Sequence, residues 1–153
     1  MTELFPYLAF EKAKDAIAYY EEVFGATNVK KLEVSEEQAE QFGMTKEQAA
    51  EATMHAEFEV LGVKILCSDS FGRVENINNG ISLLIDFDVN NQDDSDKVQQ
   101  FYDKIKDHDS IDIEMPLKEQ FWGGKMGAFT DKYGVRWMLP VSYTHLTLPT
   151  KRI

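Results

Sequence analysis

An internal repeat constrains the fold of this chain more than any other feature of its sequence. Hydrophobic periodicity gives each half the same order of elements, namely a strand, a helix and three further strands. The apolar positions of the two helices match at one constant offset: Ile17, Tyr20 and Phe24 correspond to Val98, Phe101 and Ile105. The two hairpins match at another offset, with residues 62–66 corresponding to 134–138. This repetition predicts two modules of the same βαβββ topology.

Apolar spacing and the intervening turn residues predict the individual elements. The first helix has one apolar stripe that includes Ala13, and it ends at Gly25, a residue that tolerates the left-handed conformation at a helix C-terminus. Pro116 places its strand at a sheet edge. The predicted strands cover 4–10, 28–34, 54–60, 63–68, 81–89, 111–117, 125–131 and 135–140, and the predicted helices cover 12–24 and 94–106, the second capped by Asp94 or Ser95.

Residues 35–52 interrupt the first module. Ser35 with Gln38, and Thr45 with Gln48, each have the spacing of a capping box, in which a hydroxyl and a Gln side chain satisfy backbone N–H groups at a helix start. Two short helices around Gly43 are therefore expected. The segment is either a solvated surface excursion or a flap over a pocket.

We expect an α+β fold in which the two modules pair into a curled antiparallel sheet with a cleft, while one helix covers the other face of each sheet. Residues 1–140 would form a single domain of two modules, at about 4–69 and 80–140. Residues 141–153 follow the last strand and differ in composition from the acidic body. They resemble a non-native extension, and we expect their deletion to leave folding unchanged.

Composition narrows the classes of partner and compartment. Lys and Arg number 16 against 27 Asp and Glu, a net charge of −11 that argues against binding to nucleic acid phosphates. The 43% of hydrophobic residues argues against a disordered chain, and a single cysteine excludes a disulfide scaffold. Neither a membrane-length apolar run nor a secretory signal is present, so a cytoplasmic protein without a membrane partner is expected.

Residues 121–137, FWGGKMGAFTDKYGVRW, resemble the closing motif of PhnB-like proteins. These belong to the vicinal oxygen chelate superfamily, together with glyoxalase I, extradiol dioxygenases and bleomycin-resistance proteins. PYLAF at 6–10, MHAE at 54–57 and LCSD at 66–69 are similar as well, so the resemblance covers about residues 4–140. PhnB-like proteins often carry a demethylubiquinone methyltransferase label, but no strand here is followed by a glycine-rich cofactor turn.

Strand alternation divides the side chains between a helix-covered face and a cleft face. The helix-covered set is Leu8, Phe10, Phe58, Val60, Ile65, Cys67, Leu83, Ile85, Phe87, Phe129, Trp137 and Leu139. The cleft set is Phe5, Tyr7, His55, Glu57, Leu66, Ser68, Ser82, Leu84, Asp86, Ala128, Arg136 and Met138.

The resemblance implies metal ligands on the first and last strand of each module. The matching positions here are Phe5 or Tyr7, Leu66, Ser82 and Met138. None of these is an ordinary ligand for Mg²⁺, Zn²⁺, Ni²⁺ or Fe²⁺. We therefore expect neither a metal nor another cofactor.

His55 and Glu57 are the candidate catalytic residues. They lie two apart on one strand and point the same way, so a general base next to a carboxylate is one interpretation. The two could instead begin an unusual metal site, or His55 could make an ordinary hydrogen bond. His108 is expected to be solvated, and Cys67 to pack as a small hydrophobic residue, with a catalytic thiol as the alternative.

The candidate ligand-binding residues combine aromatic, polar and apolar side chains of the cleft. Trp122 either stacks on a ligand or fills the interface between the modules. Arg136 either meets a carboxylate or phosphate, or forms a salt bridge with Asp86 or Glu57. The full set is Tyr7, Leu66, Ser82, Asp86, Trp122, Arg136 and Met138.

Three functions fit these observations. The first is metal-independent binding of a small molecule, or chemistry that relies on the cleft alone. The second is a metal enzyme of the glyoxalase or dioxygenase kind with displaced ligands such as His55 and Glu57. The third is a drug-sequestering protein, for which the acidic composition suits a cationic ligand. The sequence does not identify the small-molecule ligand.

We predict a homodimer. The sheet edges, and above all the strand at 111–117 with its apolar side, favour pairing with a second copy. A stable interface would bury on the order of 1,200–2,000 Å². Light scattering at micromolar concentration and moderate salt should report a dimer, and a 17.5 kDa monomer would contradict the prediction.

Overall fold

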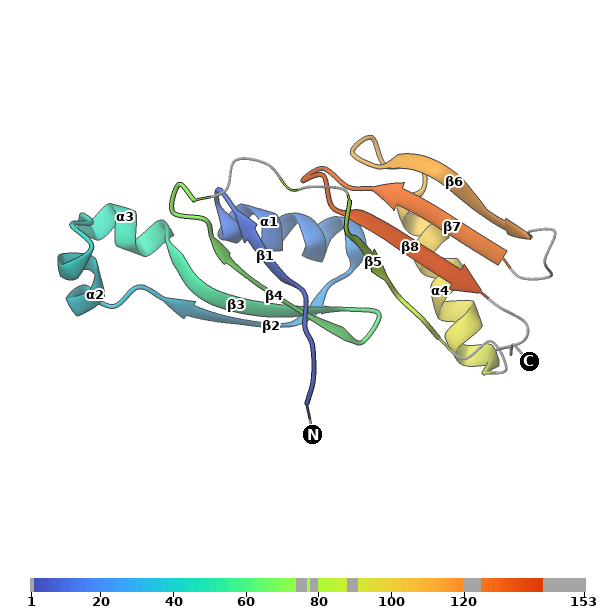
Figure 1. Cartoon of the computed structure of the whole chain (residues 1–153), viewed down its shortest axis with the longest axis horizontal. Helices are drawn as coiled ribbons and strands as arrows, with labels where there is room; N and C mark the ends of the chain where they lie inside the picture. Colours follow the sequence, from blue (N-terminus) through green and yellow to red (C-terminus); the bar gives the residue numbers. More distant parts are fainter. Residues whose placement is uncertain (1, 74–76, 78–79, 88–90, 120–124, 142–153) are drawn as a thin grey trace. The chain divides into compact units, whose positions relative to one another are not determined.

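The computed structural model describes residues 2–73, 77, 80–87, 91–119 and 125–141. The chain divides into two compact units, Met1–Ile77 and Asn78–Ile153 (Figure 1). Each unit holds one four-stranded sheet, with strand order β1-β4-β3-β2 in the first and β5-β8-β7-β6 in the second. The two orders are equivalent, so the repeat and the α+β class predicted from the sequence are confirmed. The assignment of 1–140 to one domain stays a prediction.

The first unit contains four strands and a helical insertion. Its elements are β1 (Tyr7–Phe10), α1 (Ala13–Tyr19), a π-helical turn (Tyr20–Phe24), β2 (Thr27–Glu33), α2 (Glu36–Gln41), α3 (Lys46–Glu51), β3 (Thr53–Val60) and β4 (Val63–Asp69). α1 lies along the sheet, whereas α2 and α3 follow the end of β2 (Figure 1). Leu4 is outside β1 and almost fully exposed, so the first strand begins later than predicted.

The predicted apolar stripe of the first helix forms the core of this unit. Ala13, Ile17 and Tyr20 are fully buried, and Phe24 is nearly so. Tyr20 stacks on Phe58 of β3 with 5.1 Å between ring centroids. The helix ends where Gly25 adopts φ 70°, as its position predicted. The last turn is π-helical rather than α-helical, a detail that the sequence did not indicate.

The insertion folds as the two capping boxes predicted. Ser35 Oγ accepts the Gln38 N–H, and Thr45 Oγ1 accepts the Gln48 N–H. In return, Oε1 of each Gln accepts the backbone N–H of its capping residue. The small residues of both helices pack into a separate apolar cluster with neighbouring segments; its members are Val34, Ala39, Ala49 and Ala52, with Met44 and Met54 against them. The insertion therefore has a core of its own.

Asp69, at the end of β4, connects three segments of the first unit. Its side chain is buried, and Oδ1 accepts the N–H of Ala13 at 2.7 Å while Oδ2 accepts the N–H of Thr53 at 3.0 Å. Lys12 precedes the helix and gives it no side-chain cap. A carboxylate from a distant strand thus supplies the cap of α1 and also fixes the start of β3.

The second unit repeats this arrangement without the insertion. Its elements are β5 (Ser82–Leu84), α4 (Gln92–Ile105), β6 (Asp112–Glu119), β7 (Lys125–Thr130) and β8 (Arg136–Val141). Its core combines the buried face of α4 with the predicted sheet residues Phe129, Trp137 and Leu139, all of which are fully buried. β6 is the edge strand, as Pro116 predicted.

Both sheets are mixed rather than antiparallel throughout. β1 pairs with β4 in parallel, and β5 pairs with β8 in parallel, whereas the other neighbours are antiparallel. In each unit the helix crossover makes the second strand run parallel to the first, and two antiparallel pairings then place the last strand beside the first in the same direction. The expectation of purely antiparallel sheets was therefore wrong for the first strand of each module.

Two boundaries in the second unit also differ from the predictions. Asn91, not Asp94 or Ser95, caps α4, because its side chain accepts the N–H of Asp94 at 3.2 Å. β5 is much shorter than the predicted 81–89 strand: Ile81 is exposed, 85–87 are not in a strand, and 88–89 lie outside the described residues. The predicted tail lies outside them as well, apart from Val141 in β8.

Replacing Asp69 with alanine should destabilise the protein strongly. The change leaves two buried N–H groups without an acceptor, at about 1–3 kcal/mol each. Urea unfolding should therefore show a loss of roughly 2–5 kcal/mol. Asp107→Ala, at an exposed position, should change the free energy of unfolding by less than about 0.5 kcal/mol. Equal stability of the two variants would contradict this role of Asp69.

Candidate functional site

The side of each sheet that faces away from the helix carries most of the predicted site residues. In the first unit, Tyr7 pairs with Leu66, Leu66 with Glu57, and His55 lies two residues before Glu57 on β3. Paired residues and every second residue of a strand share a face. The four side chains therefore gather on one face, which we call the first open face.

The first open face holds a hydrogen-bonded pair of ring side chains. The Tyr7 hydroxyl lies 3.1 Å from His55 Nδ1, and the two ring centroids are 5.6 Å apart. The tyrosine is about half exposed and the histidine is half-buried. An aromatic side chain is long enough to reach a diagonal neighbour across a sheet, which explains the contact between strands that are not adjacent.

Glu57 has a different partner from the one its position suggested. Its carboxylate forms an ion pair with Lys64 at 3.4 Å, and the Lys64 ammonium also lies over the Phe5 ring at 5.6 Å. The hydrogen bond of His55 goes to Tyr7 instead. The structure thus brings together Tyr7 with His55, and Glu57 with Lys64; the catalytic role of His55 and Glu57 stays a prediction.

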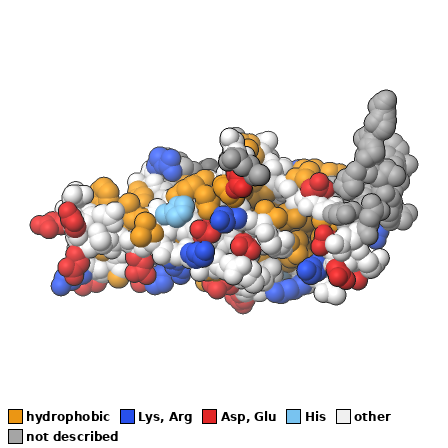
Figure 2. Space-filling view, turned by 90° about the horizontal axis from the view of Figure 1, so that it is seen from below, with side chains coloured by type: hydrophobic (Ala, Val, Ile, Leu, Met, Phe, Trp, Pro, Cys, Tyr) orange, Lys and Arg blue, Asp and Glu red, His pale blue; other side chains and the backbone are white. Residues whose placement is uncertain are grey.

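Exposed hydrophobic side chains surround these polar groups. On the first open face Leu32 pairs with His55 across β2 and β3 and is 60% exposed, while Phe5 is 37% exposed. The space-filling view shows hydrophobic side chains reaching the surface, with a histidine beside such a group (Figure 2). The face therefore combines apolar contact area with a few polar groups, which is typical of ligand sites.

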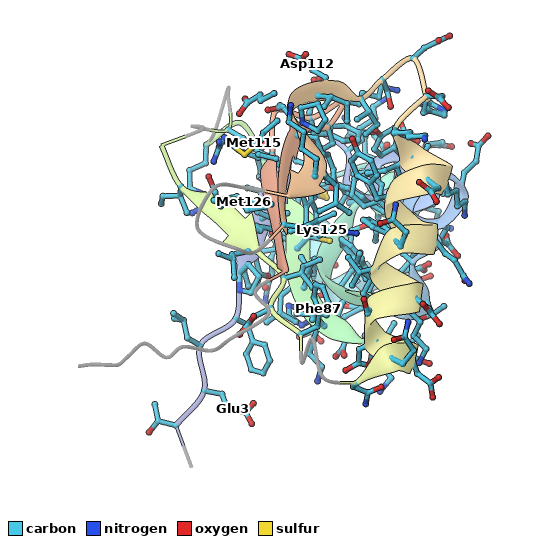
Figure 3. All side chains as sticks on the ribbon, turned by 90° about the vertical axis from the view of Figure 1, so that its right-hand side faces the viewer. Glu3, Phe87, Asp112, Met115, Lys125 and Met126 are labelled. Carbon is cyan, nitrogen blue, oxygen red and sulfur yellow. The ribbon has the colours of Figure 1, made fainter. Side chains whose placement is uncertain are left out.

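The equivalent face of the second unit, the second open face, carries Ser82, Arg136, Leu84 and Met138. Ser82 pairs with Arg136, and Leu84 pairs with Met138, in the parallel register of β5 and β8. In Figure 3, α4 lies on one side of this sheet and Met115 on the other. Met115 pairs with Ala128, which pairs with Met138, so an apolar row adjoins the Arg136 row.

Arg136 is held by two side chains of other strands, and a third side chain supports one of them. Its Nε donates to Glu114 Oε2 at 2.7 Å, and its Nη1 donates to Ser82 Oγ at 2.9 Å. Thr130 Oγ1 donates to the other oxygen of Glu114 at 3.1 Å. The predicted salt bridge to Asp86 or Glu57 was therefore wrong: the carboxylate comes from the edge strand β6.

The network also changes the acidity of Glu114. The hydrogen bond from Arg136 lowers the pKa of this carboxyl, and the bond from Thr130 and the guanidinium charge act in the same direction, against a smaller effect of burial. Thr130 pairs with Arg136 across β7 and β8, and Glu114 of β6 reaches both side chains. The sequence analysis assigned neither Glu114 nor Thr130 to this face.

Four further residues were singled out by the sequence analysis. Cys67 is fully buried as predicted, and burial together with the charge of Asp69 raises the pKa of its thiol to about 12. Asp86 follows β5 and is exposed. Trp122 lies outside the described residues. His108 is on the surface but is not merely solvated, because its Nδ1 lies 2.8 Å from Ser110 Oγ.

The residues present do not fit the metal site of the superfamily. Tyr7, Leu66, Ser82 and Met138 offer no imidazole or carboxylate at the expected positions, and among the described residues no cluster of three or more His, Cys, Asp or Glu side chains forms. Carboxylates suit hard cations such as Mg²⁺, and imidazole suits Zn²⁺, Ni²⁺ and Fe²⁺. Within the same residues, no helix is long and apolar enough to cross a membrane.

Comparison with known proteins identifies relatives along the whole folded chain. The family model of 3-demethylubiquinone-9 3-methyltransferase matches residues 2–140. Protein YjdN of Escherichia coli is 30% identical, over 90% of this chain and 94% of that protein.

Solved structures share the fold. A PhnB protein from Bacillus cereus, also called a putative 3-demethylubiquinone-9 3-methyltransferase, is 24% identical with a TM-score of 0.57, over 92% of this chain and all of that one (100%). The fosfomycin resistance protein FosX of Listeria monocytogenes is 15% identical with a TM-score of 0.54, over 95% of each chain.

Glu114→Gln should reduce stability at neutral pH but not in acid. Because the folded-state pKa of Glu114 is lowered, its carboxylate stabilises the protein above the unfolded pKa of about 4.5, and this is lost as the pH falls through the folded value. The group is partly exposed, so the expected loss at pH 7 is only about 0.2–1 kcal/mol. Urea unfolding at pH 7 and pH 3 measures this loss of stability, with Asp112→Asn as the control. A loss that persists unchanged at pH 3 would contradict the role of the Glu114 carboxylate.

Proposed function

Because this chain belongs to the PhnB-like family of the vicinal oxygen chelate superfamily, we propose that it binds a small molecule on its first open face without a divalent metal. The model of this family is that of 3-demethylubiquinone-9 3-methyltransferase. The observation that carries the proposal is the Tyr7–His55 hydrogen bond on an otherwise apolar part of that face.

The Tyr7–His55 pair suits recognition of a polar group. If the Tyr7 hydroxyl donates to Nδ1, the neutral imidazole carries its proton on Nε2 and can donate to a ligand; if Nδ1 carries the proton, Nε2 is an acceptor. In either case Tyr7 orients the ring. Leu66, which pairs with Tyr7, and Leu32, which pairs with His55, would supply apolar contact on both sides.

The same pair can move a proton. An imidazole exchanges a proton near neutral pH, and a hydrogen-bonded phenol keeps it in one orientation for general acid–base catalysis. A reaction on the first open face would use His55 as the acid or base and Tyr7 as the positioning residue. Glu57, paired with Lys64, would then take no part in proton transfer.

Local structure favours binding or acid–base chemistry over methyl transfer. Only Glu11 and Lys12 connect β1 to α1. A nucleotide-like cofactor commonly binds a glycine-rich turn between a strand and the following helix, and this connection has neither the length nor the glycines.

A thermal-shift panel of neutral, anionic and cationic metabolites tests the proposal. A ligand at 100 times its dissociation constant stabilises a protein by about 2.7 kcal/mol, which raises the melting temperature of a domain this size by roughly 5–10 °C. Tyr7→Phe and His55→Gln should each weaken binding of the hit about two- to tenfold, through one lost hydrogen bond.

His108→Gln is the matched control, since it removes an exposed imidazole of the second unit, whose Nδ1 lies 2.8 Å from Ser110 Oγ. It should leave the affinity unchanged. A hit whose affinity is the same in all three variants would place binding elsewhere and overturn the proposal. A preference for cationic hits would favour the drug-sequestering alternative.

We also predict that protein purified without chelator carries no stoichiometric divalent ion. The reason is that Leu66, Ser82 and Met138 occupy positions where the superfamily places ligands, and none of them binds such ions well. Inductively coupled plasma mass spectrometry should find less than about one-tenth of an ion per chain. One equivalent of Zn, Ni, Mn or Fe, lost on His55→Gln, would instead support the displaced-ligand enzyme.

A further inference from the structure

We propose that Arg136, on the second open face, binds the oxyanion group of a small ligand whose apolar part lies against Leu84 and Met138. The inference goes beyond the proposed function, because it assigns a separate site whose ligand is an amphiphilic carboxylate or phosphonate. It uses residues of the second unit alone.

The guanidinium of Arg136 is fixed before any ligand arrives. Glu114 holds Nε at 2.7 Å and Ser82 holds Nη1 at 2.9 Å, so bonds on two sides define the plane of the group. Thr130 in turn holds the second oxygen of Glu114. An arginine oriented in this way has already lost much of its rotamer entropy, which lowers the cost of binding an anion.

The donors that remain are arranged for an oxyanion. A guanidinium has five N–H groups, and the bonds to Glu114 and Ser82 use two of them. Within the described part of the chain, nothing accepts from Nη2, which leaves its two N–H groups and one on Nη1. The remaining N–H groups lie on both terminal nitrogens and can donate to the oxygens of a carboxylate or phosphonate.

Charge does not prevent this interaction. Glu114 neutralises the guanidinium, but the bond it accepts comes from Nε, and the terminal nitrogens carry further N–H groups. The Arg136 side chain is 26% exposed, so the group is accessible and also partly shielded from water. Hydrogen bonds formed by charged donors in such a setting are stronger than those between neutral groups.

The neighbouring row supplies a surface for an apolar body. Leu84 pairs with Met138 two residues along from the Ser82–Arg136 pair, on the same face. Leu84 is 52% exposed although it is a large hydrophobic residue, and Met138 is half-buried. A ring or short alkyl group attached to the oxyanion would cover this exposed surface and gain hydrophobic free energy.

The arginine side chains can be followed individually by NMR. The chain has three arginines, Arg73, Arg136 and Arg152, so the ¹⁵N-labelled full-length protein gives three Nε–Hε signals, assigned with Arg136→Lys and Arg73→Lys. Benzoate and phenylphosphonate are the probes, and benzyl alcohol is the uncharged analogue with the same ring. The titrations are made at low ionic strength.

We expect at least one of the two anions to shift the Arg136 signal saturably, while benzyl alcohol and the Arg73 signal show no such shift. A response to benzoate alone assigns the carboxylate class, and a response to phenylphosphonate alone assigns the phosphonate class. Arg136→Lys keeps the charge but loses the planar fork, so affinity should fall about tenfold, whereas Arg73→Lys should not change it.

Ser82→Ala removes the hold on Nη1 and should weaken binding about two- to fivefold. The proposal is overturned if neither anion gives a saturable Arg136 shift in the wild-type protein, if all three arginines drift together, or if Arg136→Lys binds as well as the wild type. The first two outcomes need no variant, so they hold even if one misfolds. Binding at the first open face is tested separately with Tyr7→Phe and His55→Gln, so failure of this inference leaves the proposed function standing.

Discussion

A buried carboxylate organises the first unit. Asp69 accepts one N–H from the start of α1 and one from the start of β3, so the helix, two strands and the insertion that precedes β3 all depend on one side chain. The second unit uses the same chemistry at a different place. Asp131 accepts the N–H groups of Tyr133 and Val135 in the β7–β8 turn and the indole N–H of the buried Trp137. In both units, a charge removed from water is compensated by fixed donors, which commits the surrounding backbone to one arrangement.

Under the proposed function, this organisation separates stability from recognition. The helix-covered face of each sheet holds the aromatic core, where Tyr20 stacks on Phe58 and Phe129 stacks on Trp137. The open faces carry side chains that are held mainly by other side chains, such as Tyr7 by His55 and Arg136 by Glu114. Substitutions on an open face can therefore change what the protein binds while leaving the aromatic core intact.

The sequence predicted what depends on local pattern and missed what depends on distant partners. The sequence predicted the apolar stripe of Ile17 and Tyr20 and the capping boxes at Ser35 and Thr45, because each signal lies within one or two turns of a helix. Alternation placed Arg136 on the correct face but could not name Glu114, which lies on an edge strand that has two irregularities in its register with β7. The partner of His55 was missed for a related reason: Tyr7 reaches it diagonally across a strand, a contact that no spacing along the chain encodes.

The position of Tyr7 has a consequence for the dynamics of the chain. Tyr7 begins β1, a four-residue strand at the edge of its sheet that is paired on one side only. Short edge segments open locally at a small fraction of the global unfolding free energy, and their amide protons exchange with solvent quickly. A molecule that contacts Tyr7 would have to be released before β1 could open, so occupancy of the first open face would slow amide exchange in β1. The N-terminal strand would then act as a built-in reporter of the bound state.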